Sequence, residues 1–159
     1  MYRVGIGYDI HEIRKYRKLV VGGVIISEEN GLLGHSDADV LIHAIMDALL
    51  GAAGLKDIGT YFPDNDPQFK DISSIFLLSR VYDELSSRNY SIVNIDSVIV
   101  AEKPKFKPYI DEMKINIANV LKISIEDISI KATTKENMDS TGKGLSMEAH
   151  AVAMIKRGM

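Results

Sequence analysis

Apolar and polar residues alternate along several short stretches of this chain, and this pattern predicts β-strands. Residues 2–10 are rich in β-branched residues and glycine, and residues 19–26 form a second apolar run. The basic stretch between them, residues 14–18, is expected to be a solvated loop, so we expect the two runs to pair as a hairpin. Further strands are predicted at residues 90–100, 128–134 and 147–156.

Apolar residues recur at intervals of three and four in other segments, which predicts amphipathic helices. The first helix is expected to begin at Ser36, because Ser36 and Asp39 resemble a capping box, and to end at Gly51. Two more helices are predicted at residues 73–88 and 108–121, with an Asp-, Gly- and Pro-rich loop at residues 57–67.

The order of these elements indicates an α+β fold. Helices would pack on one face of a mainly antiparallel sheet, in a ferredoxin-like α/β sandwich. The chain has 159 residues, so residues 1–159 are expected to form one domain. The other face of the sheet would stay open, and an oligomer would cover it.

The composition limits which residues could bind a metal and which partners are expected. The chain has no cysteine, so a metal could be held only by His, Asp or Glu. A net charge of −3 gives no reason to expect nucleic acid or an anionic membrane as a partner. The N-terminus has no signal-peptide pattern and no apolar run is long enough to span a bilayer, so a cytoplasmic protein is expected.

Asp9, His11 and His43 form the candidate metal site. Residues i and i+2 of a strand project to the same side, so Asp9 and His11 point together. His43 lies two turns into the first predicted helix, and three protein ligands would leave a fourth position of a zinc ion open. The alternative is structural: an Asp-x-His pair is common by chance, and a histidine beside an apolar helix face is often a hydrogen-bonded core residue.

Two other segments suit phosphate groups. His35 and Ser36 precede a helix N-terminus, which offers free N–H groups to an anion, although Ser36 could simply cap the helix. Residues 131–136 supply threonine hydroxyls and Glu136, a possible ligand of a hard cation, at what could also be a plain strand end. Residues 141–144 form a basic turn without the P-loop pattern, and residues 101–106 form a Pro-restrained turn.

Together these segments resemble the 2-C-methyl-D-erythritol 2,4-cyclodiphosphate synthase family of the non-mevalonate isoprenoid pathway. The matching stretches are Gly7-Tyr8-Asp9-Ile10-His11, Gly34-His35-Ser36-Asp37-Ala38-Asp39 with His43, Asp57-Ile58-Gly59 with Phe62-Pro63-Asp64-Asn65-Asp66, Pro104-Lys105, and Lys131-Ala132-Thr133-Thr134 through Glu136. They follow the family's order and cover essentially the whole chain. The combination is far more specific than any of its motifs alone.

The resemblance implies an intramolecular phosphoryl transfer, catalysed by a phosphorus–oxygen lyase. The 2-phosphate of 4-diphosphocytidyl-2-C-methyl-D-erythritol 2-phosphate would attack the β-phosphorus of the diphosphate. CMP would leave, and 2-C-methyl-D-erythritol 2,4-cyclodiphosphate would form. Because the nucleophile belongs to the substrate, the protein would mainly position a flexible polyanion and offset its charge.

The resemblance also implies roles for individual residues. Asp9, His11 and His43 would hold zinc, and Glu136 would help hold magnesium or manganese. His35 and Thr134 would be the catalytic residues, as donors to the transition state. The implied substrate-binding residues are Asp9, His11, His35, Ser36, Asp57, Gly59, Phe62, Asp64, Asp66, Ala101, Lys105, Phe106, Thr133, Thr134, Glu136 and Lys143.

Within that set, Asp57 and Gly59 would contact the erythritol portion. Ala101, Lys105, Phe106 and Thr133 would border the cytidine, and residues 62–66 would form a mobile loop over the substrate. The resemblance further implies a homotrimer whose sheets face the trimer axis and whose active sites lie between subunits.

Two positions depart from the family pattern. Ser140 stands where many members have an aromatic residue, and Lys143 where many have arginine, so the charge is kept but the bidentate fork is lost. Contacts at these positions, and the binding of an isoprenoid diphosphate in a central cavity, stay open. Two alternatives to the synthase also remain: a metal-dependent nucleotide phosphohydrolase, and a non-catalytic nucleotide-binding module with a structural metal.

Overall fold

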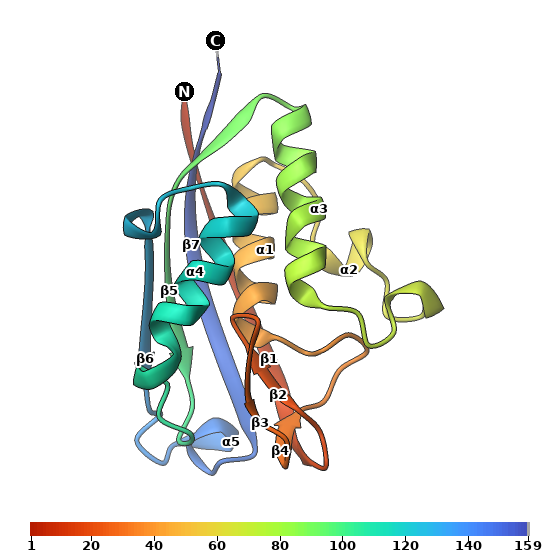
Figure 1. Cartoon of the computed structure of the whole chain (residues 1–159), viewed down its shortest axis with the longest axis vertical. Helices are drawn as coiled ribbons and strands as arrows, with labels where there is room; N and C mark the ends of the chain where they lie inside the picture. Colours follow the sequence, from red (N-terminus) through yellow and green to blue (C-terminus); the bar gives the residue numbers. More distant parts are fainter. Residues whose placement is uncertain (159) are drawn as a thin grey trace.

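Residues 1–158, the part of the chain that the computed structural model describes, fold around a five-stranded sheet of order β4-β1-β7-β5-β6. The strands are β1 (Tyr2–Lys15), β4 (Asn30–Leu32), β5 (Tyr90–Val100), β6 (Ile128–Thr133) and β7 (Ser146–Arg157). The long helices α1 (Val40–Ala52), α3 (Ser74–Ser87) and α4 (Ile110–Leu121) all lie on one face of this sheet (Figure 1).

The predicted α+β class is confirmed, and the sheet is mixed. Strand β1 runs antiparallel to β4 and β7, and β5 runs antiparallel to β7, whereas β5 and β6 are parallel. Alternating apolar residues of the central strands face the helices and are buried. This inward-facing set includes Ile95, Ile99, Ala149, Ala151 and Ala153.

The predicted hairpin between residues 2–10 and 19–26 is wrong. Strand β1 continues to Lys15 and pairs with β4 and β7, while β2 (Leu19–Val21) and β3 (Val24–Ser27) pair with each other in a separate two-stranded sheet. The reason lies in Gly22 and Gly23, whose φ angles are 60° and 72°. Two consecutive residues with positive φ form the tight turn that joins adjacent antiparallel strands, so the 19–26 run folds back on itself.

The first helix begins later than predicted, at Val40 instead of Ser36. Asp39 is the N-cap residue of α1, and its side chain accepts a hydrogen bond from the backbone N–H of Ile42 at 3.1 Å. Ser36 lies outside the helix, where its hydroxyl accepts a hydrogen bond from Ala38 N at 3.3 Å. Asp39 also accepts bonds from Gly22 N and Gly23 N, so one buried carboxylate joins the α1 cap to the β2–β3 turn.

The other predicted elements differ from the structure mainly at their ends. The helix expected at 73–88 is α3, and the one expected at 108–121 is α4, preceded by a 3-10 turn at Lys107–Tyr109. The predicted loop at 57–67 contains the short helix α2 (Ile58–Tyr61), and a 3-10 turn follows at Pro67–Phe69. The short helix α5 (Asp139–Gly142) and strand β4 had no predicted counterpart.

Helix α1 packs directly on strand β1 because two glycines of β1 face it. A Cβ atom added at Gly5 or Gly7 would overlap the backbone carbonyl oxygens of Ala48 and Ala44, respectively. No side chain fits in this contact, so the helix backbone lies against the strand. This close approach brings His43 of α1 next to Asp9 and His11 of β1.

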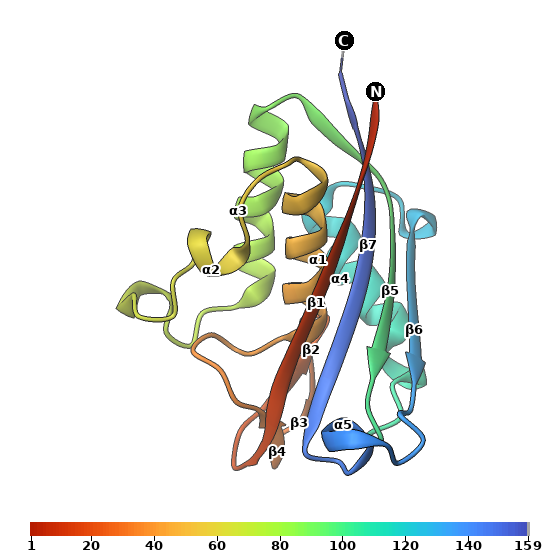
Figure 2. The ribbon, with the colours of Figure 1, turned by 180° about the vertical axis from the view of Figure 1, so that it is seen from behind.

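Within residues 1–158, none of the long helices α1, α3 and α4 covers the opposite face of the sheet, as the view from behind shows (Figure 2). The even-numbered residues of β1 point to this face and stay exposed: Tyr2, Val4, Ile6, Tyr8 and Ile10, with Val152 of β7 beside them. Among residues 1–158, no helix has the length and apolar character needed to cross a membrane.

Candidate metal centre

Asp9, His11 and His43 converge at the end of the contact between β1 and α1. Asp9 Oδ2 lies 2.8 Å from His11 Nε2 and 3.0 Å from His43 Nδ1, and the two ring nitrogens are 3.2 Å apart. The donor atoms of the three residues therefore form a small triangle. The predicted i, i+2 arrangement of Asp9 and His11 holds, because Ile10 between them points to the open face of the sheet and is 41% exposed.

This donor set fits a tetrahedral zinc ion. Metal–ligand bonds of 2.0–2.1 Å to nitrogen and oxygen correspond to ligand–ligand separations of roughly 3.3 Å, close to the observed triangle. The two imidazole rings meet at an angle of 61°, with ring centroids 5.2 Å apart, and one nitrogen of each ring lies within 3.0 Å of Asp9 Oδ2. The donors are nitrogen and oxygen atoms, as expected for a chain without cysteine.

The ionisation of these groups reflects their mutual contact. Burial opposes the charged form of Asp9, but the hydrogen bonds from His11 and His43 outweigh burial and lower its pKa from 3.8 to about 2. For His11, burial lowers the pKa, and the hydrogen bond to Asp9 overrides this and raises it above 6.5. The site thus holds an ionised carboxylate beside imidazoles, a favourable set of ligands for a cation.

The segment before α1 lies beside the metal site and is held along its whole length. His11 donates its Nδ1–H to the carbonyl of Leu33 at 2.7 Å, and His35 donates its Nε2–H to the carbonyl of Asp66 at 2.8 Å. His35 and Ser36 line the same small cavity as the three metal-site residues. The structure therefore brings both predicted phosphate-binding residues to the candidate metal centre.

Arg17 also holds this segment, which contradicts the prediction that residues 14–18 are simply solvated. Its guanidinium donates from Nε to the carbonyl of Leu32 at 2.7 Å, and from Nη2 to the carbonyls of Gly34 and Ser36 at 3.3 and 3.5 Å. Its neighbours Arg14, Lys15, Tyr16 and Lys18 are exposed, as expected. Arg17 was missed because its partners lie 15–19 residues further along the chain.

The segment that follows α1 forms one wall of the cavity. The cavity has a volume of about 180 Å³, and its walls include Gly59, Phe62 and Asp64. Asp57 caps α2 by accepting a hydrogen bond from Thr60 N, and Asp66 caps the 3-10 turn at Pro67–Phe69. A carboxylate of α1 anchors this region, because Asp47 accepts a hydrogen bond from Ile58 N at 2.8 Å.

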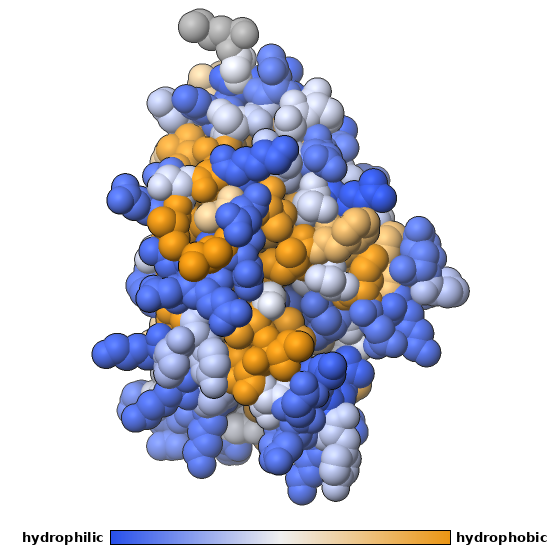
Figure 3. Space-filling view, in the orientation of Figure 1, coloured by the Kyte–Doolittle hydropathy of each residue, from blue (hydrophilic) through white to orange (hydrophobic). Residues whose placement is uncertain are grey.

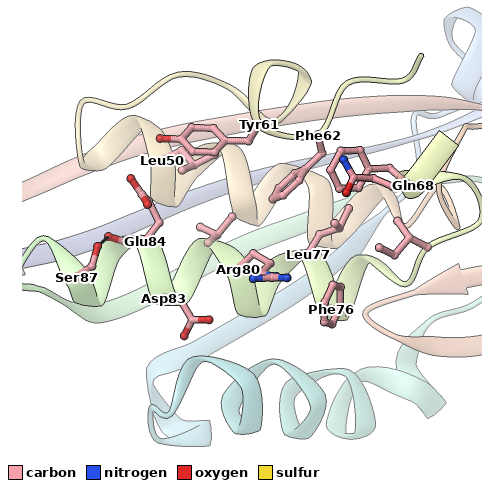
Figure 4. Close-up of a pocket in the computed structure, with 13 residues that line it drawn as sticks. Leu50, Tyr61, Phe62, Gln68, Phe76, Leu77, Arg80, Asp83, Glu84 and Ser87 are labelled. Atoms are coloured by element: carbon pink, nitrogen blue, oxygen red, sulfur yellow. Dashed lines mark hydrogen bonds between the residues drawn. The ribbon is translucent and has the colours of Figure 1, made fainter. Parts of the chain in front are cut away.

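Aromatic side chains separate this cavity from a larger groove of about 670 Å³. Phe62, Phe69 and Leu77 line both spaces, and the Phe62 and Phe69 rings meet edge to face at 5.5 Å. In Figure 4, Tyr61 and Phe62 lie on one side of the groove and Leu77 of α3 on the other. Apolar patches are visible on this side of the molecule, near α2 and α3 (Figure 3).

A second group of predicted residues lies at the far edge of the sheet. Ala101 follows β5 and donates its N–H to the carbonyl of Thr133 on β6 at 3.0 Å. Thr134 donates its hydroxyl to Glu136 Oε1 at 2.8 Å, and both residues are exposed. Lys105 is exposed, whereas Phe106 is buried in the core, with 3% of its surface exposed.

Lys143 and Ser140 lie away from the metal-centre group. Lys143 lines a cavity of about 650 Å³ together with Glu102, Lys103 and Pro104. Ser140 contacts the hydroxyl of Ser146 at 3.2 Å, within a polar cluster at the start of β7. The structure therefore does not place Lys143 at the candidate metal centre of the same chain.

The metal-centre group and the far-edge group do not meet within one chain. Asp9 pairs with Ala149, Ala149 with Ile99, and Ile99 with Ala132, so three strand spacings separate β1 from β6. That distance is roughly 14 Å across the sheet. Thr133 is also one residue out of phase with Ala132, so its side chain projects to the open face while Asp9 projects to the helix face.

Comparison with known proteins identifies the family of this chain. A model of the YgbB family matches residues 2–156. The 2-C-methyl-D-erythritol 2,4-cyclodiphosphate synthase of Desulforamulus reducens is 54% identical over 156 residues, which are 98% of this chain and 99% of that protein.

Solved structures show the same fold. The bifunctional IspDF from Campylobacter jejuni superposes with a TM-score of 0.96 at 39% identity, over 99% of this chain and 43% of that one. IspF from Plasmodium falciparum, in a complex with CDP, superposes with a TM-score of 0.87 at 34% identity, over 99% of this chain and 97% of that one. Since the family model spans nearly every residue and the identity is high over the full length, the chain belongs to the YgbB family.

Proposed function

We propose that this chain is a metal-dependent phosphorus–oxygen lyase of non-mevalonate isoprenoid biosynthesis. It converts 4-diphosphocytidyl-2-C-methyl-D-erythritol 2-phosphate to 2-C-methyl-D-erythritol 2,4-cyclodiphosphate and CMP. The observation that carries the proposal is the Asp9–His11–His43 triangle, which opens into a cavity lined by His35 and Ser36. It occurs in a chain 54% identical to a named synthase over nearly its whole length.

In the reaction, an oxygen of the 2-phosphate forms a bond to the β-phosphorus. The bond from that phosphorus to the bridging oxygen breaks, and CMP leaves with this oxygen. The substrate supplies both nucleophile and leaving group, so the protein contributes orientation and charge compensation. No covalent bond between protein and substrate is needed.

Asp9, His11 and His43 are proposed to hold zinc. A zinc ion at this position would supply a Lewis acid that polarises a phosphate oxygen. His35 is proposed to donate a hydrogen bond to the transferring phosphate, and Ser36 to bind phosphate beside the N-terminus of α1. The closeness of both residues to the triad supports these roles.

Glu136 is proposed to bind a second divalent cation, magnesium or manganese, against the diphosphate. Its carboxylate is exposed and accepts a hydrogen bond from Thr134, so it can turn to a cation without leaving a buried charge behind. Thr134 is proposed as the second donor to the transition state. Thr133, Ala101, Lys105 and Phe106 are proposed to border the cytidine, with Phe106 contributing through its backbone.

The segment around α2 is proposed to bind the erythritol portion through Asp57 and Gly59, and residues 62–66 to cover the substrate. Phe62 and Asp64 already line the metal cavity, and the Asp66 carbonyl is bonded to His35, which supports this assignment. Lys143 is proposed to contact a phosphate group of a ligand reached through a neighbouring subunit.

The chain is further proposed to act as a single domain, residues 1–159, in a homotrimer. Its ferredoxin-like sandwich would turn the open sheet face toward the trimer axis. Two features support this arrangement: the row of exposed apolar side chains on β1, and the separation of the metal-centre residues from those of the far edge. A neighbouring chain would supply the missing half of each site.

The test is to incubate the purified protein with the diphosphocytidyl substrate and divalent metal, and to follow phosphorus-containing products by ³¹P NMR. The expected products are the cyclic diphosphate and CMP, and a chelator should abolish their formation. Release of free phosphate without a cyclic product would instead identify a nucleotide phosphohydrolase, and the absence of any turnover would support a binding module.

A further inference from the structure

On the side away from Asp9, His43 is held by Ser36 and by Ser74, and no sequence motif marked Ser74. Its Nε2 lies 3.0 Å from the hydroxyl oxygen of Ser74 and 3.2 Å from that of Ser36. The hydroxyl of Ser74 in turn donates a short hydrogen bond to Asp37. Ser74 is the first residue of α3 and has no exposed surface.

The donor and the acceptor of each hydrogen bond between His43, Ser74 and Asp37 can be assigned, beginning at Asp37. Ser74 donates its hydroxyl hydrogen to Asp37 Oδ1, an oxygen that also accepts the backbone N–H of Asp39. The lone pairs of the Ser74 hydroxyl then face His43, and His43 Nε2 must carry the hydrogen of that contact. A neutral imidazole with a hydrogen on Nε2 has its free lone pair on Nδ1, the nitrogen that faces Asp9 and His11.

We propose that Ser74 and Asp37 are positioning residues that fix the tautomer and ring orientation of His43, so that Nδ1 is presented to the metal. This inference rests on the proposed metal site. Histidines that bind metals generally donate their other ring N–H to a carboxylate, carbonyl or water, which orients the ring and makes the ligand nitrogen more basic.

Asp37, Ser74 and His43 form a hydrogen-bond relay, and both oxygens of the Asp37 carboxylate accept further hydrogen bonds. Asp37 Oδ2 accepts the backbone N–H of Ser74 at 2.9 Å, and Oδ1 accepts the backbone N–H of Asp39 at 3.1 Å. Asp37 therefore joins the start of α3 to the segment that leads into α1. The serine hydroxyl cannot turn away from Asp37 without leaving the carboxylate with one bond fewer.

The second histidine of the site is oriented in the same manner. His11 Nδ1 faces the carbonyl of Leu33 at 2.7 Å, and a carbonyl can only accept, so Nδ1 carries a hydrogen. In the form that binds a metal, each ring then has its lone pair on the nitrogen that faces Asp9 Oδ2, whereas a ring donates to Asp9 only when that nitrogen also carries a hydrogen. Because His43 Nε2 already supplies a hydrogen, Ser36 cannot donate to it, and the Ser36 hydroxyl hydrogen remains available to a ligand in the cavity.

The test compares zinc binding by metal-free wild-type protein, Ser74→Ala and Ser73→Ala, using competition with a chromophoric chelator. Ser73 is a matched control, because it is exposed, adjacent to Ser74 and makes no side-chain cap hydrogen bond. Ser74→Ala should weaken zinc binding by about 10- to 100-fold, the loss typical for such partners. Ser73→Ala should bind as the wild type does. The melting temperature of each metal-free variant verifies folding.

A measurement on the wild type keeps the inference testable even if Ser74→Ala does not fold. In zinc-loaded protein labelled with ¹⁵N-histidine, His43 should show a metal-bound Nδ1 and a protonated Nε2 that exchanges slowly with solvent. A metal-bound Nε2, or unchanged zinc affinity in folded Ser74→Ala, would overturn the relay and leave the metal site intact. A wild type that binds no zinc would overturn the proposed metal site itself.

Discussion

The metal-centre half and the far-edge half of the proposed active site are built in contrasting ways. Around Asp9, His11 and His43, side chains from β1, α1 and α3 contact one another and are largely buried. Around Thr134 and Glu136, the side chains are exposed. The hydroxyl of Thr134 is bonded to a residue only two positions away.

Backbone geometry differs between the halves as well. Glu136, Asn137 and Asp139 all have positive φ angles, of 51°, 60° and 55°, which L-residues adopt at some energetic cost. Such strain in an exposed turn often accompanies a functional site. One half is therefore completed by the fold of a single chain. The other half presents its proposed ligand groups outward, which fits the proposal that a neighbouring chain completes it.

The largest expected effect tests whether the two halves of one active site come from different chains. His43→Ala and Lys105→Glu should each be inactive alone, because the first lacks a metal-binding half and the second a cytidine-binding half. Mixed under conditions that allow subunit exchange, they should regain activity, since some interfaces would combine two intact halves. Activity of the mixture, measured by CMP release, gives the result.

The control mixes His43→Ala with Asp9→Ala. Both variants are damaged in the same half, so no interface can be intact and no activity should return. If subunit exchange is demonstrated by mass spectrometry and the first mixture still stays inactive, each active site lies within one chain. The homotrimer proposal would then lose its main support.

A second prediction concerns the chemistry of the exposed half. Thr134→Ala should lower kcat by about 10²–10³-fold with little change in KM, because removing a preorganised donor to the transition state typically costs this much. Ser129→Ala, at an exposed position on β6, the strand that precedes Thr134, should leave both constants unchanged. A rise in KM with constant kcat would show that Thr134 only binds the ground state.

The two halves also differed in how far the sequence could predict them. Asp9 and His11 were predictable because the two-residue period of a strand is a local property. The position of His43 depends on how α1 lies on β1, and Gly5 and Gly7 of β1 permit that contact. The glycines were visible in the sequence, but which helix they face is a tertiary property.

The supporting residues of the metal centre were missed or misjudged. Ser74 lies 31 residues from His43 and 37 from Asp37, and a serine at the start of a helix usually indicates nothing more than a cap. Arg17 was predicted to be solvated because it belongs to a basic run. Hydrogen bonds to carbonyls far along the chain leave no periodic pattern, so the sequence alone cannot distinguish Arg17 from Arg14.

A third prediction distinguishes Arg17 from Arg14. Arg17→Lys keeps the charge but not the guanidinium fork that reaches three carbonyls before α1. It should lower the free energy of unfolding by about 1–3 kcal/mol, since hydrogen bonds from charged groups contribute on that scale. It should also lower kcat, because His35 and Ser36 would lose their support.

Arg14→Lys is the matched control, because Arg14 is exposed and pairs only with Glu12. Exposed ion pairs contribute little, so neither stability nor kcat should change. Urea denaturation and steady-state kinetics give both quantities. Equal behaviour of the two variants would show that the Arg17 hydrogen bonds do not hold the segment.

The smallest expected effect is a pH dependence confined to the metal-centre half. Burial lowers the pKa of His11, but the hydrogen bond to Asp9 outweighs burial and raises it, so protons compete with metal for His11 as the pH falls below this raised pKa. Asp9, with a pKa of about 2, stays ionised in this range and contributes nothing to the change. Zinc affinity should fall by up to about tenfold per pH unit below the His11 pKa, as expected for one competing proton.

The metal-free protein should show the opposite trend in the part of its stability that comes from His11. A raised pKa in the folded state means that the protonated form stabilises the fold below the unfolded-state pKa, and that this contribution is lost as the pH rises through the folded-state value. Melting temperatures of metal-free and zinc-loaded protein, measured between about pH 6 and pH 8, should therefore diverge as the pH rises. Parallel curves would show that His11 is not a ligand, and the difference between the two halves would then no longer rest on metal binding.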